Sequence, residues 1–464
     1  MCGIAGQLTP GGIRHRPELY SKILGTLTRR GPDQEGLFED SACVLLHRRL
    51  SVIDPEKGRQ PMTCGGCTII YNGELYNTAG LRAELTEKGV SFDTTSDTEV
   101  LLKSYLQWGY DCVKKLNGIF AFAVYDQRQR QLFFARDPIG VKPLFFAQRQ
   151  DGFYFASELK SLLCFPEIAP EVDARGLYDL MFLGPGRTPG YGVFRNVYEV
   201  LPGCCGTYGE MGLRQWAYWR LEDGAFTDSF EECAQKTRFL LEDSIQRQLV
   251  SDVPIGTFLS GGLDSSIVSA VAAKNLGTID TFSVDYRDNE KYFQATKFQP
   301  NSDPYFMDLM ARHIGARSHR IVLDTDQLVS ALFEAAEARD LPGMADVDSS
   351  MLLLCRQTKQ DVTVILSGEC ADEIFGGYPW YRDPEVRAVN GFPWAQTTDY
   401  RATFLRPELL AWQDPHEFVD HRYQDTLATV DKMPDLSPLE SRMKEMMVLN
   451  LRWFMQTLLD RKDF

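Results

Sequence analysis

Residues 254–266 read Pro-Ile-Gly-Thr-Phe-Leu-Ser-Gly-Gly-Leu-Asp-Ser-Ser, and they predict a strand, a loop and the start of a helix. The first six residues form a mostly apolar run of strand length. The two glycines of the loop let backbone N–H groups approach an anion, and the N-terminus of the following helix adds positive potential. Asp264 would repel a phosphate directly, so we expect it to bind Mg²⁺. The spacing does not fit a Walker A loop, and the alternative is a tight strand-to-helix turn without a ligand.

A second unit of the same kind begins with the run Val362–Leu366 and continues as Ser-Gly-Glu-Cys-Ala-Asp-Glu over residues 367–373. Loops at the carboxyl ends of parallel strands meet in a crevice where ligands bind. We therefore expect Asp372 to join Asp264 around Mg²⁺, and Glu369 to face the reacting centre. The alternative for these acids is helix capping, which is worth about 0.3–1 kcal/mol for each residue.

Strand and helix patterns alternate through the second half of the chain. Such alternation predicts an α/β domain with a doubly wound parallel sheet. The expected elements are the helix Phe230–Val250, the strand Pro254–Leu259, the helix Ser265–Lys274, the strand Thr281–Asp285, the helix Tyr305–Ile314 and the strand Val362–Leu366.

The first half of the chain has a different pattern of predicted secondary structure. Short strand-like runs separated by turn residues predict stacked, mostly antiparallel sheets, and helical patterns interrupt them at Thr78–Lys88 and Thr98–Trp108. The runs are Cys67–Tyr71, Phe120–Tyr125, Gln131–Ala135, Leu144–Ala147 and Phe153–Ala156. We therefore predict two domains, 2–215 and 230–464, with a boundary near residues 215–235.

The chain begins Met-Cys-Gly-Ile, and removal of Met1 would leave Cys2 with a free α-amine beside its thiol. An α-amine has a pKa of about 7.7–8.0, so an N-terminal nucleophile can carry its own general base. An amino-acid substrate also needs a cation, an anion and oxyanion donors, which Arg49, Asp97 and the pair Asn72-Gly73 can supply. The alternatives are surface ion pairs worth about 0–1 kcal/mol and, for Asn-Gly, a hairpin turn.

The composition and charge of the chain exclude several classes of function. Lys and Arg number 49 against 64 Asp and Glu, a net charge of −15, whereas nucleic-acid-binding proteins are usually basic. No apolar run approaches the ~18 residues of a membrane helix, and the N-terminus has no signal-peptide pattern. The 11 cysteines are odd in number and favour a reducing compartment. We therefore expect a cytoplasmic protein with small-molecule substrates and neither nucleic acid nor membrane as partner.

The N-terminal motifs resemble the glutaminase domain of class II, N-terminal-nucleophile amidotransferases, whose fold is an α+β αββα sandwich. The matching motifs are Cys2-Gly-Ile, Arg30-Gly-Pro-Asp33, His47–Asp54, Tyr71–Asn77, Ser96-Asp-Thr-Glu99 and Arg136–Pro143. The resemblance implies that Cys2 is the nucleophile, that its amine shuttles the proton, and that Asn72 and Gly73 form the oxyanion hole. It also implies a glutamine site formed by Arg49, Leu50, Val52, Ile53, Asn72, Gly73, Glu74 and Asp97, with Arg49 on the carboxylate and Asp97 and Glu74 on the α-amine.

The loop Ser260–Ser266 is similar to the pyrophosphate-binding loop of the ATP-pyrophosphatase family. Together with the glutaminase motifs and the stretches 337–350 and 367–380, it resembles the glutamine-hydrolysing asparagine synthetases of the bacterial B type. The resemblance implies ATP and Mg²⁺ as cofactors and a homodimer, with Asp264 and Asp372 as metal ligands and Glu369 supporting acyl-adenylate formation. The implied ATP-binding residues are Leu259, Ser260, Gly261, Gly262, Asp264, Ser265, Val284, Ser367 and Gly368.

The implied reaction is ATP-dependent synthesis of L-asparagine from L-aspartate, with ammonia from glutamine and with β-aspartyl-AMP as intermediate. Members of the family usually continue well past the motif Leu458–Asp463, so we expect the synthetase domain to be truncated relative to the family. Two alternatives are an amidotransferase of the same architecture with another carboxylate acceptor, and a glutaminase-only fragment. Two further alternatives, a phosphoribosyl or hexosamine amidotransferase and a regulatory protein without activity, conflict with the Ser260–Ser266 loop or with the intact site motifs.

Overall fold

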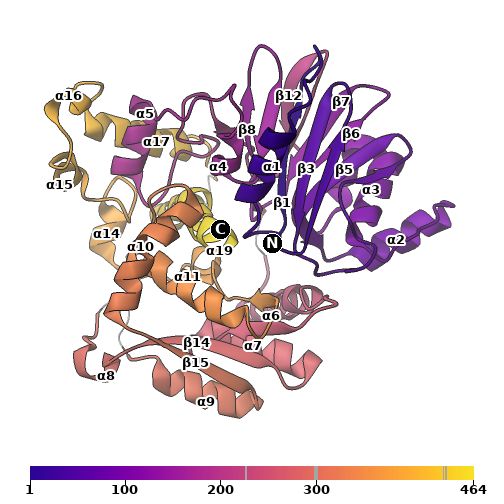
Figure 1. The fold of residues 1–464 in the computed structure, drawn as a ribbon. Helices are drawn as coiled ribbons and strands as arrows, with labels where there is room; N and C mark the ends of the chain where they lie inside the picture. Colours follow the sequence, from indigo (N-terminus) through magenta and orange to yellow (C-terminus); the bar gives the residue numbers. More distant parts are fainter. Residues whose placement is uncertain (225–226, 297–300, 432, 434–435) are drawn as a thin grey trace. The chain divides into compact units, whose positions relative to one another are not determined.

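The computed structural model describes residues 1–224, 227–296, 301–431, 433 and 436–464 (Figure 1). The chain forms two compact units. Unit 1 contains residues 1–179, 187–222 and 463–464, and unit 2 contains residues 180–186 and 223–462. Each unit therefore takes short segments from elsewhere in the chain.

Unit 1 contains two six-stranded antiparallel sheets. The first sheet has the order β10-β8-β9-β1-β3-β2, and the second has the order β12-β11-β7-β6-β5-β4. The strands of the first sheet are β1 (Gly3–Leu8), β2 (Gln34–Glu39), β3 (Cys43–Arg49), β8 (Phe145–Gln148), β9 (Phe153–Ala156) and β10 (Tyr198–Glu199). Those of the second are β4 (Met62–Cys64), β5 (Cys67–Leu75), β6 (Gly118–Asp126), β7 (Gln131–Arg136), β11 (Cys204–Gly209) and β12 (Gly212–Ala217).

The two sheets face each other across one hydrophobic core. Ile4 and Leu45 from the first sheet pack with Ile70, Ala123 and Phe134 from the second. The helices α2 (Thr78–Glu87) and α3 (Asp97–Trp108) cover the outer face of the second sheet, and α1 (Pro17–Thr26) and α4 (Leu159–Leu162) pack against the first. The αββα sandwich predicted from the sequence is therefore confirmed.

Unit 2 is built around a parallel sheet of four strands with the order β15-β14-β13-β16. The strands are β13 (Ile255–Phe258), β14 (Asp280–Tyr286), β15 (Arg317–Leu323) and β16 (Val364–Leu366). One face packs against α6 (Phe230–Arg247) and α7 (Leu263–Leu276), where Ile255 joins Ile245 and Val268. The other face packs against α11 (Asp346–Thr358) through Phe282 and Leu354. Helices on both faces confirm the doubly wound α/β prediction.

The remaining helices of the described chain lie mainly in unit 2. They are α5 (Ala174–Tyr178), α8 (Asn289–Tyr292), α9 (Pro304–Ile314), α10 (Thr325–Arg339), α12 (Ala371–Phe375), α13 (Pro379–Arg382), α14 (Pro384–Ala388), α15 (Thr398–Ala402), α16 (Pro407–Leu410), α17 (Pro415–Leu427), α18 (Pro438–Leu449) and α19 (Met455–Asp463). Short irregular helical turns span Gly109–Lys115, Asp179–Leu183 and Asn450–Phe454. Among the described residues, no helix combines the length and apolar character needed to cross a membrane.

We predict that Phe133→Ala destabilises unit 1 by about 3–5 kcal/mol, because a fully buried phenyl ring is lost and a cavity remains. Phe133 lies on β7 and stacks on Tyr105 with ring centroids 5.5 Å apart. The free energy of unfolding from urea titration measures the effect. Phe333→Ala is the matched control, because its ring is 89% exposed, and we expect a change within about 0.5 kcal/mol. Equal losses in both variants would contradict the burial argument.

Candidate active sites

The first candidate site begins with Cys2, directly before β1. The start of this strand is fixed by Ser157, whose hydroxyl accepts from the N–H of Ile4 at 3.0 Å and whose N–H donates to the Ile4 carbonyl at 2.8 Å. β1 pairs antiparallel with β3 so that Gly3 lies opposite Arg48. This register brings Cys2 to the end of β3, where its thiol donates to the Leu50 carbonyl at 3.6 Å.

Arg49 is the last residue of β3, and its guanidinium holds the loop that follows. Its Nη2 donates to the carbonyl oxygens of Ile53 and Asp54 at 2.8 and 2.7 Å. Its Nη1 donates to Gln34 Oε1 and to the Pro55 carbonyl, both at 3.1 Å. Arg49 thus shapes the segment that contains the predicted glutamine-binding residues.

Asn72 and Gly73 lie on β5 and have the properties that an oxyanion hole requires. Asn72 is 1% exposed, yet neither its side-chain nitrogen nor its oxygen has a hydrogen-bond partner among the described residues. A buried amide without partners costs about 1–3 kcal/mol, so a ligand that bonds it recovers that energy. Gly73 cannot be replaced by a larger residue, because a Cβ there would lie 2.1 Å from the Ile119 carbonyl.

Asp97 and Glu74 supply negative charge to the same region. Asp97 begins α3, and its Oδ2 accepts from the Tyr71 hydroxyl at 2.9 Å and from the Leu75 N–H at 3.3 Å. Burial raises the pKa of Asp97, and the hydrogen bond from Tyr71 opposes this rise. Burial also raises the pKa of Glu74 to about 7, against the lowering effect of the Lys142 charge.

The charges of these groups affect the pKa of the Cys2 thiol. Burial raises the pKa of the Cys2 thiol, the chain-terminal ammonium and Arg49 lower it, and Asp97 raises it. Burial lowers the pKa of the Met1 amine to about 5. His47 is no substitute cation, because burial lowers its pKa to about 3.

The structure thus gathers most of the predicted glutaminase residues. Leu50 and Ile53 contribute backbone carbonyl oxygens, whereas Val52 has an apolar side chain that is half-buried. The sequence reasoning missed Tyr71, which holds Asp97. It also missed Arg30 and Lys142, although both belong to the motifs quoted for the glutaminase resemblance. Their presence in those motifs could have marked Arg30 and Lys142 as site residues. A motif does not predict, however, which group a cation contacts.

The second candidate site lies in unit 2, where two loops follow neighbouring parallel strands. Thr257 on β13 lies opposite Leu366 on β16, so the loops 260–266 and 367–373 start side by side. They touch at Gly368, where a Cβ would lie 2.8 Å from the backbone carbon of Asp264 and from the backbone nitrogen of Ser265. Gly368 therefore allows this close approach of the two loops.

The first loop is held by its own serines and by β14. Ser260 donates its N–H to Ser265 Oγ at 3.2 Å, and the two hydroxyls lie 3.0 Å apart. The Leu259 N–H donates to the Phe282 carbonyl at 2.9 Å, one strand away. Gly261 and Gly262 complete the turn, and Gly261 has a φ of +84°, a conformation that glycine adopts easily. Val284 lies further along β14 and packs toward α11.

Three carboxylates lie on these loops. Burial raises the pKa of Asp372, and the negative charges of Asp264 and Glu369 raise it further. Burial also raises the pKa of Asp264. A carboxylate whose ionisation is disfavoured by a neighbouring acid fits a bound divalent cation, and Mg²⁺ is usually held by one or two carboxylates plus phosphate oxygens. The described residues contain no cluster of three or more side chains arranged as metal ligands.

Glu369 is bound by two cations of α19 that the sequence reasoning did not assign. Arg461 Nη2 lies 3.1 Å and Lys462 Nζ lies 3.3 Å from Glu369 Oε2. Lys462 also donates to Ser367 Oγ at 2.9 Å. Both cations come from the motif Leu458–Asp463, almost a hundred positions after Glu369, so no local pattern predicts the contact.

Two family models match the chain, a glutamine amidotransferase domain over residues 1–219 and asparagine synthase over residues 236–464. Asparagine synthetase [glutamine-hydrolyzing] 3 of Bacillus subtilis is 45% identical over 473 aligned positions, which cover 100% of this chain and 77% of the relative. The chain belongs to the family of glutamine-hydrolysing asparagine synthetases. The recognition and enzyme class predicted from the sequence are therefore confirmed, and asparagine synthetases use ATP.

Two other asparagine synthetases match over a smaller share of their own length. Asparagine synthetase [glutamine-hydrolyzing] 1 of Bacillus subtilis is 34% identical over 83% of this chain and 60% of the relative. Asparagine synthetase [glutamine-hydrolyzing] 3 of Arabidopsis thaliana is 32% identical over 82% of this chain and 61% of the relative. The chain thus spans about three fifths of the length of these two relatives.

Solved structures give a weaker likeness. Glutamine phosphoribosylpyrophosphate amidotransferase from B. subtilis, complexed with ADP and GMP, is 16% identical with a TM-score of 0.36, over 79% of this chain and 81% of that one. A structure described as the allosteric regulatory enzyme of purine biosynthesis is also 16% identical, with a TM-score of 0.37, over 69% of this chain and 80% of that one.

We predict that Gly368→Ala weakens MgATP binding about tenfold or more, because overpacking typically costs about 1–3 kcal/mol and the obstacle here is backbone. Titration calorimetry with MgATP measures the effect, and glutamate formation from glutamine should stay unchanged. Gly80→Ala is the matched control, because a Cβ on that glycine of α2 meets nothing within 4 Å. Unchanged ATP binding by a folded Gly368→Ala variant would show that the contact between the loops does not shape the site.

Proposed function

We propose that this chain makes L-asparagine from L-aspartate and ATP, using ammonia released from glutamine. The observation that supports this most strongly is that each unit carries a candidate site matching its own half of the reaction. Unit 1 offers a thiol, a cation, two acids and an unpartnered buried amide. Unit 2 offers two touching loops with three carboxylates at the ends of parallel strands.

In the glutaminase half, Cys2 Sγ attacks the side-chain amide carbon of glutamine and its proton passes to the α-amine. Asn72 and the Gly73 N–H stabilise the oxyanion. Ammonia leaves with the proton returned by the amine, and a glutamyl thioester remains. Water then attacks the thioester carbon, the C–S bond breaks, and glutamate leaves.

In the synthetase half, the β-carboxylate of aspartate is a poor electrophile and needs activation. Its oxygen attacks the α-phosphorus of ATP, and pyrophosphate leaves, which gives β-aspartyl-AMP. Ammonia attacks the activated carbon, AMP leaves, and asparagine forms. Asp264 and Asp372 would hold Mg²⁺, which neutralises phosphate charge when bound. The loop residues Ser260, Gly261, Gly262, Ser265, Ser367 and Gly368, together with Leu259 and Val284, would hold the nucleotide.

Glu369 has a specific part in this proposal. Its carboxylate is held by Arg461 and Lys462, two cations that also suit the negative charge developing on the phosphate during adenylation. We further propose that the two domains span residues 2–215 and 230–464. We also propose that the protein is cytoplasmic and forms a homodimer.

We predict that Cys2→Ala abolishes glutamine-dependent asparagine formation, because the only group that forms the thioester is removed. Ammonium chloride should still support formation of AMP, pyrophosphate and asparagine by the same variant. Glutamate, AMP and asparagine are measured in parallel with each nitrogen source. Cys233→Ala, a half-buried cysteine of α6, is the control and should keep both activities. Loss of the ammonia-dependent reaction in folded Cys2→Ala would argue against the division of labour.

We predict that kcat/KM for glutamine falls as the pH drops below about 7. Burial raises the pKa of Glu74 to about 7, so acidification neutralises the carboxylate expected to hold the substrate ammonium. One protonation gives at most a tenfold loss for each further pH unit.

The Glu74→Gln variant separates this effect from titration of the α-amine. It should have a lower kcat/KM at pH 8 and a flatter profile between about pH 6 and 8. The ammonia-dependent reaction should have the same pH profile in both proteins. An unchanged acidic limb in Glu74→Gln would assign that limb to another group.

A further inference from the structure

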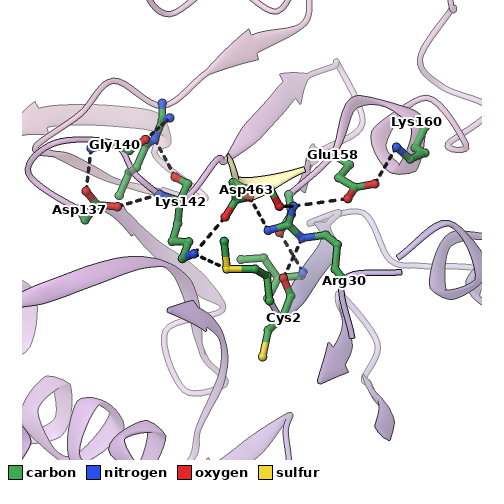
Figure 2. A network of polar contacts seen from close by, with 12 residues as sticks. Cys2, Arg30, Asp137, Gly140, Lys142, Glu158, Lys160 and Asp463 are labelled. Carbon is green, nitrogen blue, oxygen red and sulfur yellow. Dashed lines mark hydrogen bonds and ion pairs between the residues drawn. The ribbon is translucent and has the colours of Figure 1, made fainter. Parts of the chain in front are cut away.

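Asp463 brings a buried carboxylate between two buried cations of unit 1. Its Oδ2 lies 2.5 Å from Arg30 Nη2, and its Oδ1 lies 3.0 Å from Lys142 Nζ. The side chains of all three residues are at most 2% exposed. Figure 2 shows the Asp463 carboxylate between Lys142 on one side and Arg30 on the other. The ion pairs are therefore shielded from water and from salt.

Arg30 connects this carboxylate to the nucleophile. Its Nε donates to the Cys2 carbonyl at 2.8 Å, while Nη2 faces Asp463. The other acid near this guanidinium is Glu158, whose Oε1 lies 3.4 Å from Nη1. The carboxylate of Asp463 is thus the closer anchor, and it fixes the plane of the guanidinium whose Nε reaches Cys2.

Lys142 is held from its backbone side. Its N–H donates to Asp137 Oδ2 at 2.9 Å and its carbonyl accepts from Arg136 Nε at 2.8 Å. The ammonium group therefore projects from a rigid turn toward Asp463 (Figure 2). With both cations placed by other contacts, the position of the carboxylate between them is strongly determined.

We propose that Asp463 is a positioning residue for the Cys2 nucleophile, acting through Arg30 on the Cys2 carbonyl. The carbonyl, the thiol and the α-amine of Cys2 branch from one Cα, so fixing the carbonyl limits the directions of the other two. The Cys2 sulfur points away from the Asp463 carboxylate (Figure 2), so this carboxylate does not contact the thiol. The inference rests on the proposed glutaminase function of Cys2.

The test is Asp463→Asn in the full 464-residue chain. We expect kcat for glutamine hydrolysis to fall about 10- to 100-fold, because a small misplacement of a reacting group has effects of this size. KM for glutamine should change less than about twofold, since the groups expected to bind glutamine remain. Ammonia-dependent AMP formation should be retained. A merely structural role would lower the melting temperature without a selective loss of kcat for glutamine.

Two matched variants sharpen the result. Asp463→Glu keeps the negative charge and should recover a large part of the lost kcat. Asp179→Asn removes another fully buried carboxylate of unit 1, one that accepts from the Thr188 hydroxyl at 2.7 Å. It should lower the melting temperature and leave kcat for glutamine unchanged. Equal kcat losses in Asp463→Asn and Asp463→Glu would overturn the role of the charge.

If Asp463→Asn alone does not fold, the double variant Asp463→Asn with Lys142→Gln replaces one ion pair by two neutral amides. The kcat loss should persist, because Arg30 still lacks its closer anchor. A folded single or double variant with wild-type kcat would overturn the proposal. Glutamate formation by Cys2→Ala would instead refute the proposed glutaminase, whereas an inactive Cys2→Ala beside a normal Asp463→Asn would refute only the positioning role.

Discussion

The antiparallel pairing of β1 with β3 is the constraint on which the glutaminase site depends. It sets Gly3 opposite Arg48, and so it places the thiol of Cys2 over Leu50 and within electrostatic reach of Arg49. A slip of one residue would turn every side chain of β1 to the opposite face of the sheet. Ile4 would then leave the core between the two sheets, where it is fully buried. The hydrophobic core therefore protects the register, and the register positions Cys2, the proposed nucleophile.

The two candidate sites use buried charge in different ways. Around Cys2, cations and acids alternate, and the Arg30–Asp463–Lys142 group is compensated within itself. In unit 2, by contrast, the negative charge of Asp264 raises the pKa of Asp372. A buried pair of opposite charges is stable only while both partners remain. A pair of carboxylates, in contrast, is stabilised by a bound cation. In the first arrangement, the chain itself compensates the buried charges. The second arrangement is suited to bind a cation.

The sequence predicts those features that depend on neighbouring residues. Apolar runs with flanking turn residues located β5, β6, β7 and β9 closely, and the alternation of strands and helices predicted the parallel sheet. Periodicity was less informative about burial, since Phe239 and Leu240 on α6 are 68% and 61% exposed. Contacts between distant positions have no local signal. Asp463 meets Arg30 across 433 positions, and Tyr71 meets Asp97 only because β5 and α3 pack together.

Arg49 shows why the role of a site residue is harder to predict than its presence. The sequence pattern calls for a cation near a substrate carboxylate, yet both terminal nitrogens of Arg49 already bind the loop 53–55 and Gln34. Gly58 lies close enough that a Cβ there would come within 2.3 Å of Nη2, so the guanidinium has little room to swing away. A carboxylate that binds here must therefore meet a cation whose orientation the loop has already fixed. Such an arrangement lowers the entropy lost on binding. If Arg49 holds the glutamine carboxylate as proposed, recognition depends on the conformation of residues 53–55 as much as on the charge of Arg49.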